Sequence, residues 1–318
     1  MSKRDDFKNA EKKIKVIVYT SEAKEAPAND VFNSCYEMRQ HIMNLIDNFN
    51  NKSDEEKMVL GKKHKCRVRT IRCINTTKDV WDDIPILLLQ ISEHKTGIPD
   101  MFVERDEKRL INFEDKVGSD YNCALLYPII NRKGDHLSNN WLIFVYDDPG
   151  KDDNEVITTV KAVLKTALNL KIQHVKPQNA KEEIERAGII PNMHVQYITI
   201  TNENNERIEL QGYKVKTKVV KTEYIDFEEI PAEEVNTFIS KPKDTNYLRR
   251  KINLILKNNK SLRFDHQMDE NEQTIKDAIE QVYNKELNIP NKEIPNMYDP
   301  KYILNKLKVV VEEYLKNE

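Results

Sequence analysis

Basic side chains gather in a segment whose spacing favours contact with a phosphate backbone. Residues 61–78 hold seven basic residues and no acidic one. Alternation at 66–70 predicts a strand in which Lys65, Arg67 and Arg69 line one exposed face at intervals of about 7 Å, close to the phosphate spacing of an extended strand. The candidate contacts in this segment are Lys62, Lys63, Lys65, Arg67, Arg69 and Arg72.

Two further basic segments lie later in the chain. In 213–221 lysines alternate with valine and threonine, and in 241–263 the only acidic residue is Asp244. The nearby aromatic residues Tyr213, Tyr247 and Phe264 could stack on unpaired bases. The candidate contacts here are Lys214, Lys216, Lys218, Arg249 and Arg250. The competing interpretation is that lysines on exposed strands keep sheet edges soluble.

Carboxylates at the ends of apolar strands support a second hypothesis, a magnesium-dependent nuclease. Asp147 and Asp148 follow the apolar run 141–146, and Glu93 follows the run 86–91. Such a layout can hold Mg²⁺ and supply a general base. It resembles that of Toprim-type nucleases, except that their paired aspartates are separated by one residue.

A second group of acidic residues could also hold a metal ion or form a turn. Pro99–Asp100 followed by Asp106–Glu107–Lys108 resembles the restriction-nuclease pattern, although five intervening residues are few for a hairpin that brings both acids to one metal. The alternative for both constellations is a solvated turn.

Other spacings exclude several classes of protein. The seven glycines are never closer than sixteen residues apart, so the glycine-spaced phosphate loops of dinucleotide enzymes, P-loop NTPases and kinases are absent. The histidines are at least twenty residues apart and the four cysteines form no C-x-x-C pair. We therefore expect no cofactor, no metal site and no assigned catalytic residue.

Composition points to a cytoplasmic globular protein. The chain has 318 residues, of which 33% are charged and 39% hydrophobic, with a net charge of −2. The first twenty residues lack the apolar run of a signal peptide, and the longest apolar runs are about six residues, far short of the ~20 that span a bilayer. We expect no direct membrane insertion.

The elements that must position these residues follow from periodicity. Alternating or apolar runs predict strands at 14–19, 66–70, 86–91, 100–104, 123–130, 141–146, 193–201, 207–210 and 213–220. Helical spacing predicts helices at 30–49 with Asp30 as N-cap, 155–170, 179–188 with a glycine cap, 232–239, 245–256, 270–287 and 301–315 behind Asp299 and Pro300.

These elements predict an α+β fold with mixed or antiparallel sheets and flanking helices. The charged turn at 147–154 predicts a boundary between an N-terminal domain, 1–150, and a second α+β domain, 151–318, with a helical C-terminal part. The apolar stripe of the last helix is expected to pack against its own domain.

One peptide and the order of the elements resemble a known family. The peptide 97–106, the apolar strand that runs into an acidic loop, and the alternating strand with an asparagine turn at 197–205 resemble the phage lambda exclusion protein RexA and related DNA-binding phage-defence sensors. The DNA-binding subunit of the Kiwa defence system is similar in role. The resemblance implies a dimeric cytoplasmic DNA-binding sensor that signals to a separate effector protein, and it transfers no catalytic residue.

The sequence thus favours a prokaryotic nucleic-acid-binding protein, with DNA as the expected ligand, that contacts the phosphate backbone without base-specific readout. The first alternative is the magnesium-dependent nuclease that uses Glu93, Asp147 and Asp148. The second is a protein interaction subunit, including a homo-oligomer, whose segregated basic and acidic faces dock on each other.

Overall fold

The computed structural model divides the chain into two compact units. Unit 1 comprises residues 1–173 and 285–318, and unit 2 comprises residues 174–284. The structure describes residues 12–23, 31–57, 67–73, 80–81, 83–95, 101–103, 110–112, 120–130, 132–133, 136–147, 153–176, 179–201, 219–240, 249–257, 260–268, 275–296 and 299–316. Within these ranges no helix combines the length and the apolar character needed to cross a membrane.

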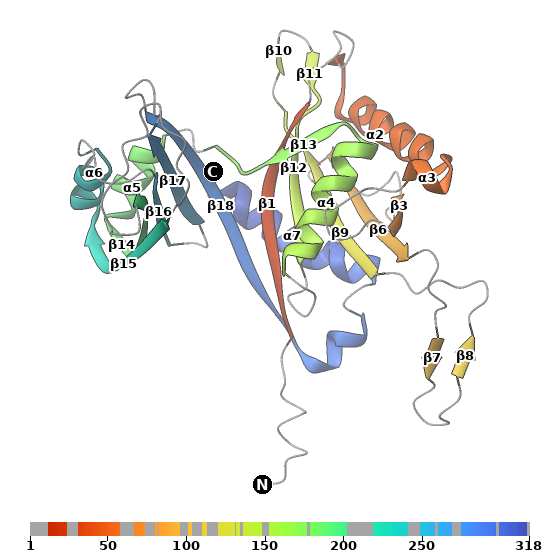
Figure 1. Cartoon of the computed structure of the whole chain (residues 1–318). Helices are drawn as coiled ribbons and strands as arrows, with labels where there is room; N and C mark the ends of the chain where they lie inside the picture. Colours follow the sequence, from red (N-terminus) through yellow and green to blue (C-terminus); the bar gives the residue numbers. More distant parts are fainter. Residues whose placement is uncertain are drawn as a thin grey trace, which may run out of the picture. The chain divides into compact units, whose positions relative to one another are not determined.

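An antiparallel sheet forms the centre of unit 1 (Figure 1). Its neighbouring strands are β1 (Lys12–Ala23), β12 (Trp141–Asp147), β9 (Asp120–Pro128), β6 (Leu87–Lys95) and β3 (Arg67–Cys73), in that order. The middle strands are almost continuously apolar, and every side chain from Asn122 to Pro128 is buried. Such runs are typical of a sheet covered on both faces.

Helices cover both faces of this sheet. On one face, α2 (Cys35–Asn50) and α4 (Asp153–Ala167) contribute to the same core as Ile143 and Val145 of β12. On the other face lies α7 (Pro300–Lys316), whose Tyr314 ring packs edge-on against Phe144, with the centroids 5.7 Å apart. Odd-numbered and even-numbered side chains of β12 therefore both pack against helices, on opposite faces of the sheet.

Local caps define where these helices begin. Ser34 caps α2, because its Oγ accepts from the backbone N–H of Glu37 at 3.2 Å. The predicted cap, Asp30, lies outside the described residues, and the helix begins at Cys35. Asp299 caps α7 as predicted, with its Oδ1 accepting from the N–H groups of Lys301 and Tyr302.

Short elements complete unit 1. They are β2 (Val31–Phe32), α3 (Asp54–Lys57), β4 (Val80–Trp81), β5 (Ile84–Pro85), β7 (Met101–Val103), β8 (Leu110–Asn112), β10 (Arg132–Lys133), β11 (His136–Ser138), β13 (Leu170–Gln173) and the 3₁₀ helix η1 (Asn291–Asn296). The pairs β7–β8 and β4–β5 form separate two-stranded sheets.

Unit 2 is built on a second antiparallel set of strands. Their order is β15 (Val219–Pro231), β14 (Ile189–Thr201), β16 (Arg249–Ile255), β17 (Lys260–Met268) and β18 (Ile275–Ile289). The last residues of β18, from Lys285 onward, belong to unit 1. The helices α5 (Ala180–Ala187) and α6 (Ala232–Ser240) pack on one face of the strands through Ile184 and Val235.

The structure confirms the predicted α+β class and corrects two of the predicted helices. Residues 245–256 and 270–287 were predicted as helices, but the strands β16 and β18 occupy 249–255 and 275–289. The buried residues Ile252, Leu254 and Leu256 alternate with the more exposed Lys251, Asn253 and Ile255, which is the strand period. For β18, apolar residues four and three apart mimic a helical face, and pairing with β17 overrides that pattern.

The division into units also differs from the predicted boundary near residue 150. Helix α4 was predicted to open the second domain, but Val160 and Leu164 pack in the unit 1 core beside Ile143. Likewise α7 belongs to unit 1, where its stripe of Ile303, Leu307, Val310 and Tyr314 is buried. The charged turn at 147–154 therefore connects two elements of unit 1.

Candidate functional site

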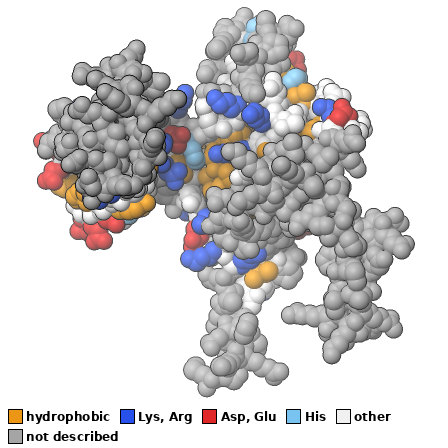
Figure 2. Space-filling model, viewed as in Figure 1, with side chains coloured by type: hydrophobic (Ala, Val, Ile, Leu, Met, Phe, Trp, Pro, Cys, Tyr) orange, Lys and Arg blue, Asp and Glu red, His pale blue; other side chains and the backbone are white. Residues whose placement is uncertain are grey.

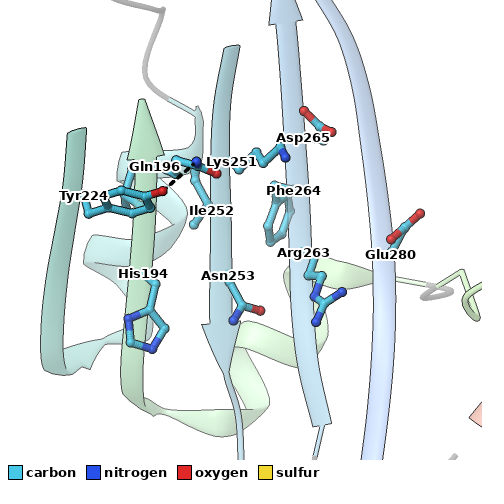
Figure 3. A pocket seen from close by; sticks show the side chains of 11 residues that line it. His194, Gln196, Tyr224, Lys251, Ile252, Asn253, Arg263, Phe264, Asp265 and Glu280 are labelled. Atoms are coloured by element: carbon cyan, nitrogen blue, oxygen red, sulfur yellow. Dashed lines mark hydrogen bonds between the residues drawn. The ribbon is translucent and has the colours of Figure 1, made fainter. Parts of the chain in front are cut away.

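A cavity of about 390 Å³ opens on the face of the unit 2 strands opposite α5 and α6 (Figure 3). The strands position it by simple alternation. In β16 and β17, Ile252, Leu254, Leu262 and Phe264 belong to the core under the helices. The residues between them therefore project from the opposite face, since successive side chains of a strand alternate.

Strand register aligns these alternate residues in two rows across the sheet. The first row consists of Asp226, His194, Asn253, Arg263 and Glu280. The second row consists of Tyr224, Gln196, Lys251 and Asp265. Side chains at directly opposite positions lie roughly 5 Å apart at Cβ, so each row forms a continuous polar surface.

A hydrogen bond between a carboxylate and the ring orients the imidazole of the first row. His194 Nδ1 lies 2.6 Å from Asp226 Oδ1, and the two side chains are 45% and 71% exposed. The carboxylate orients the ring through Nδ1. The Nε2 atom is then the nitrogen that can contact a ligand.

An aromatic ring stands at the edge of the cavity in the second row. Tyr224 is 72% exposed, and its hydroxyl accepts from Gln196 Nε2 at 3.3 Å. Figure 3 shows this bond between neighbouring strands. An exposed ring anchored by its hydroxyl presents a flat face on which a planar ligand can stack.

The cations of the cavity exceed its uncompensated acids. Lys251, Arg263, Asp265 and Glu280 line it. Asp265 accepts a two-pronged hydrogen bond from Arg249, which lowers the pKa of Asp265 and raises that of Arg249. With the charge of Asp265 matched by Arg249, the lining carries Lys251 and Arg263 against Glu280. The net charge of this lining is therefore +1, and Asp226 lies next to it beside His194, so a ligand with a single negative charge suits it.

Most of the predicted phosphate contacts are not tested by the described side chains. Lys62, Lys63, Lys65, Lys214, Lys216 and Lys218 lie outside the described residues. Arg67, Arg69 and Arg72 lie on β3, the last strand in the order of the unit 1 sheet, where the structure describes their backbone. Ile71, next to Arg72, is buried in the core under α2.

The two remaining predicted contacts, Arg249 and Arg250, have partners within unit 2. Arg249 forms the pair with Asp265. Arg250 is only 4% exposed: its guanidinium lies over the Phe238 ring at 5.2 Å, and Nη2 donates to the Ile239 carbonyl at 3.4 Å. Because alternate strand residues face opposite sides, Arg250 points toward α6 rather than toward the cavity.

The residues of the nuclease hypothesis do not form a described metal site. Asp147 is 2% exposed at the end of β12, with Lys15 as its register partner, and Asp148 lies outside the described residues. Strand β9 separates β12 from β6, which carries Glu93. Asp100, Asp106, Glu107 and Lys108 also lie outside the described residues. Among the residues that are described, no group of three or more metal-ligand side chains occurs.

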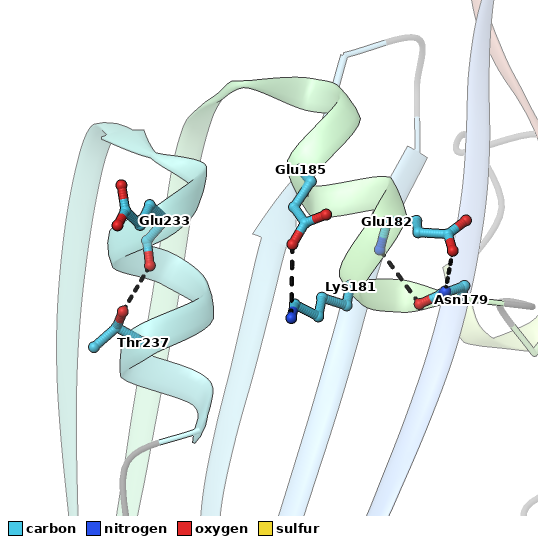
Figure 4. A network of polar contacts seen from close by, with 6 residues as sticks. All are labelled: Asn179, Lys181, Glu182, Glu185, Glu233 and Thr237. Carbon is cyan, nitrogen blue, oxygen red and sulfur yellow. Dashed lines mark hydrogen bonds and ion pairs between the residues drawn. The ribbon is translucent and has the colours of Figure 1, made fainter.

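Other polar contacts of unit 2 lie within the helices α5 and α6. Asn179 caps α5 by accepting from the Glu182 N–H at 3.3 Å, and Lys181 pairs with Glu185 at 3.8 Å on the next turn (Figure 4). In α6 the Thr237 hydroxyl donates to the Glu233 carbonyl at 2.9 Å. These contacts are local within each helix, and none of these residues lines the cavity on the strands. In the space-filling view, acidic and apolar side chains gather where Figure 1 places α6 and β15 (Figure 2).

Sequence reasoning missed His194, Gln196 and Tyr224. The predicted strand at 193–201 already placed His194 and Gln196 on one face, opposite Met193 and Val195. Pairing with Tyr224, Lys251 and Arg263 could not be read from that alternation, since those residues lie on other strands. No protein-family model, no curated protein and no solved structure matches this chain.

Proposed function

We propose that this chain is a cytoplasmic nucleic-acid-binding protein that holds a single-stranded segment on the uncovered face of unit 2. The observation that carries the proposal is the cavity in which Lys251 and Arg263 lie on the same face as the exposed Tyr224 ring. Cations attract the phosphates, and an aromatic ring stacks on an unpaired base.

The size and chemistry of the cavity favour an unpaired nucleotide over a duplex. A volume of about 390 Å³ suits a small ligand, and stacking on Tyr224 requires a base that is not already stacked in a duplex. The amide of Gln196 and the imidazole of His194 supply polar atoms at the same face. We expect sequence-tolerant binding, because stacking and phosphate contact do not distinguish bases strongly.

The basic segments outside the described residues remain part of the proposal. Lys214, Lys216 and Lys218 precede β15 directly in the chain, and Lys62, Lys63 and Lys65 precede β3. Either segment could extend the path of a strand beyond one nucleotide. The resemblance to RexA-type sensors would place this binding in phage defence, where a separate effector protein receives the signal.

The decisive experiment measures binding of labelled single-stranded DNA, single-stranded RNA and duplex DNA by fluorescence anisotropy at two salt concentrations. The test variant carries Lys251→Gln and Arg263→Gln. Its matched control carries Lys181→Gln and Lys257→Gln, which remove the same charge from exposed positions outside the cavity lining. We expect the test variant to bind at least about tenfold more weakly and to lose about 1.4 from the salt slope, and the control to bind like the original chain.

Two results would overturn the proposal. Equal weakening in the test and control variants would show that only net charge matters. Binding of duplex DNA alone, unaffected by Tyr224→Ala, would show that the cavity is not the site. A parallel reaction with Mg²⁺ tests the nuclease alternative, in which Asp147→Asn abolishes cleavage of the labelled strand. A variant with Lys62, Lys63 and Lys65 replaced by Gln tests the first basic segment.

A further inference from the structure

The outer edge of β15 is the most exposed regular element that the structure describes. β15 pairs with β14 on one side and stands at the end of the strand order. Every side chain from Val220 to Glu229 is exposed. An end strand of 13 residues offers a long row of backbone N–H and C=O groups to another strand.

Four large apolar side chains on this strand are exposed, although the Phe227 ring also contacts Phe238 of α6, with the centroids 6.2 Å apart. Val220 is 53% exposed, Tyr224 72%, Ile225 42% and Phe227 37%. No other element in the described part of the chain exposes as many large apolar side chains. Since natural edge strands are normally short or strongly charged, this combination marks a surface that is covered in use.

We infer that β15 pairs antiparallel with β15 of a second copy of this chain, with Ile225 at the twofold axis. Two identical antiparallel strands are related by a twofold axis perpendicular to the sheet, so one residue must face itself. Centring on Ile225 places the entire strand, 219–231, opposite itself, with the left-handed backbone of Glu229 (φ 51°) as a local departure from extended geometry. In that register Lys221 lies opposite Glu229 twice, and Val220 lies opposite Ile230 twice.

Neighbouring registers are less favourable. Centring on Asp226 places two aspartates opposite each other and sets Glu223 against Glu229. Centring on Glu223 places two glutamates opposite each other, and centring on Tyr224 pairs no opposite charges. Like charges directly opposite destabilise a sheet, whereas opposite charges stabilise it. The charge order of β15 is therefore complementary to itself in the register that also pairs the full strand.

Four acids on β15 could instead only protect the edge from pairing. Lys221 forms an ion pair with Glu223 of its own strand at 2.7 Å, and both side chains stay more than half exposed, so Lys221 can also meet Glu229 of a second copy. A purely protective role of the acids also leaves Ile225 exposed, and leaves Phe227 partly exposed beside its contact with Phe238. A second copy satisfies both features, because it covers the apolar side chains and compensates Glu229.

Pairing would bring two cavities onto one surface. A twofold axis perpendicular to the sheet keeps both uncovered faces on the same side. β16 and its copy would then lie five strand spacings apart, about 24 Å. One nucleic-acid strand could contact both cavities, although the pairing of β15 does not depend on what the cavities bind.

Cysteine cross-linking of the full chain tests the register. In Ile225→Cys the two introduced residues face each other, with Cα atoms about 5 Å apart, inside the range for a disulfide. Val220→Cys is the matched control, because it lies on the same strand and is similarly exposed, but its copy would be about 34 Å away. We expect mild oxidation to yield a covalent dimer for Ile225→Cys, and only background dimer for Val220→Cys and the original chain.

A charge swap tests the same register without cysteine. Lys221→Glu and Glu229→Lys should each weaken the dimer about tenfold in sedimentation equilibrium, and the double variant should restore it. Lys257→Glu controls for net charge at an exposed position away from β15. The inference fails if the original chain sediments as a monomer at the highest attainable concentration, if the double variant stays weak, or if only a basic partner peptide occupies the edge.

Discussion

The strands of unit 1 and those of unit 2 use their side chains in opposite ways. In unit 1 both faces are covered, so Ile143 and Val145 pack under α2 and α4 while Phe144 packs against Tyr314 of α7. In unit 2 the described helices cover one face, and β16 alternates between buried Ile252 and Leu254 and the polar residues Lys251 and Asn253. The comparison shows that a strand packed against helices on one face only has every second side chain available to contact a ligand.

The largest effect is expected in the doubly covered sheet. Phe144→Ala removes a fully buried ring between β12 and α7 and should lower the free energy of unfolding by about 3–5 kcal/mol, since the site cannot collapse completely. Both tryptophans, Trp81 and Trp141, lie in unit 1, so their fluorescence in a urea titration reports this unit. A loss below about 1 kcal/mol would mean that α7 does not cover this face.

The polar attachment of α7 should give a smaller, pH-dependent effect. Burial, together with the hydrogen bond that Tyr302 donates to Glu293 at 2.8 Å, raises the pKa of Tyr302 to about 12. Because the folded pKa is raised, this stabilisation is present at neutral pH and is lost as pH rises from about 10 toward 12.

Tyr302→Phe should therefore cost about 1–1.5 kcal/mol at pH 8, and the difference from the original chain should shrink in alkaline urea titrations. Absorbance of ionised tyrosine provides a direct check. If the variant shows the same high-pH titration as the original chain, the raised pKa belongs to another tyrosine.

In unit 2, the ion pair on the uncovered face should contribute less. The hydrogen bond from Arg249 lowers the pKa of Asp265. Its stabilisation is present above the ordinary aspartate pKa of about 3.9 and is lost as pH falls through the lowered value.

Asp265→Asn should cost up to about 1 kcal/mol at pH 7, because both side chains are partly exposed and solvent screens the pair. Far-UV circular dichroism during urea unfolding at pH 7 and pH 3 measures the difference. A penalty that does not diminish in acid would assign the effect to packing rather than to charge.

The smallest stability effect is expected inside the cavity. Gln196→Ala removes the donor to the Tyr224 hydroxyl, which is largely exposed, and should change the free energy of unfolding by less than about 0.5 kcal/mol. Binding of single-stranded DNA in the anisotropy assay should nevertheless weaken, because the ring loses its anchor. A stability loss comparable to that of Phe144→Ala would contradict the proposed difference between the strands of unit 1 and those of unit 2.

The sequence predicted most elements of unit 1 and little of the geometry of unit 2. Apolar runs such as 141–146 and the caps at Asp299 and Gly188 depend on local chemistry, and the structure confirms them. The strands β16 and β18 were predicted as helices, because apolar spacing over a few residues fits both periods and only pairing partners decide. Once 249–255 is a strand, Arg250 and Lys251 must face opposite sides, which the sequence alone did not reveal.

By itself the sequence determined the α+β class, the helix caps, the apolar strands of unit 1 and the absence of glycine-rich phosphate loops, since these follow from residue types and short-range spacing. Tertiary structure alone decided that α4 and α7 join unit 1, that Arg249 pairs with Asp265, and that His194 and Tyr224 share a face with Arg263. The physical reason is that strand order and register bring together residues far apart in the chain. The sequence of one strand does not specify which other strand its backbone N–H and C=O groups will bond to.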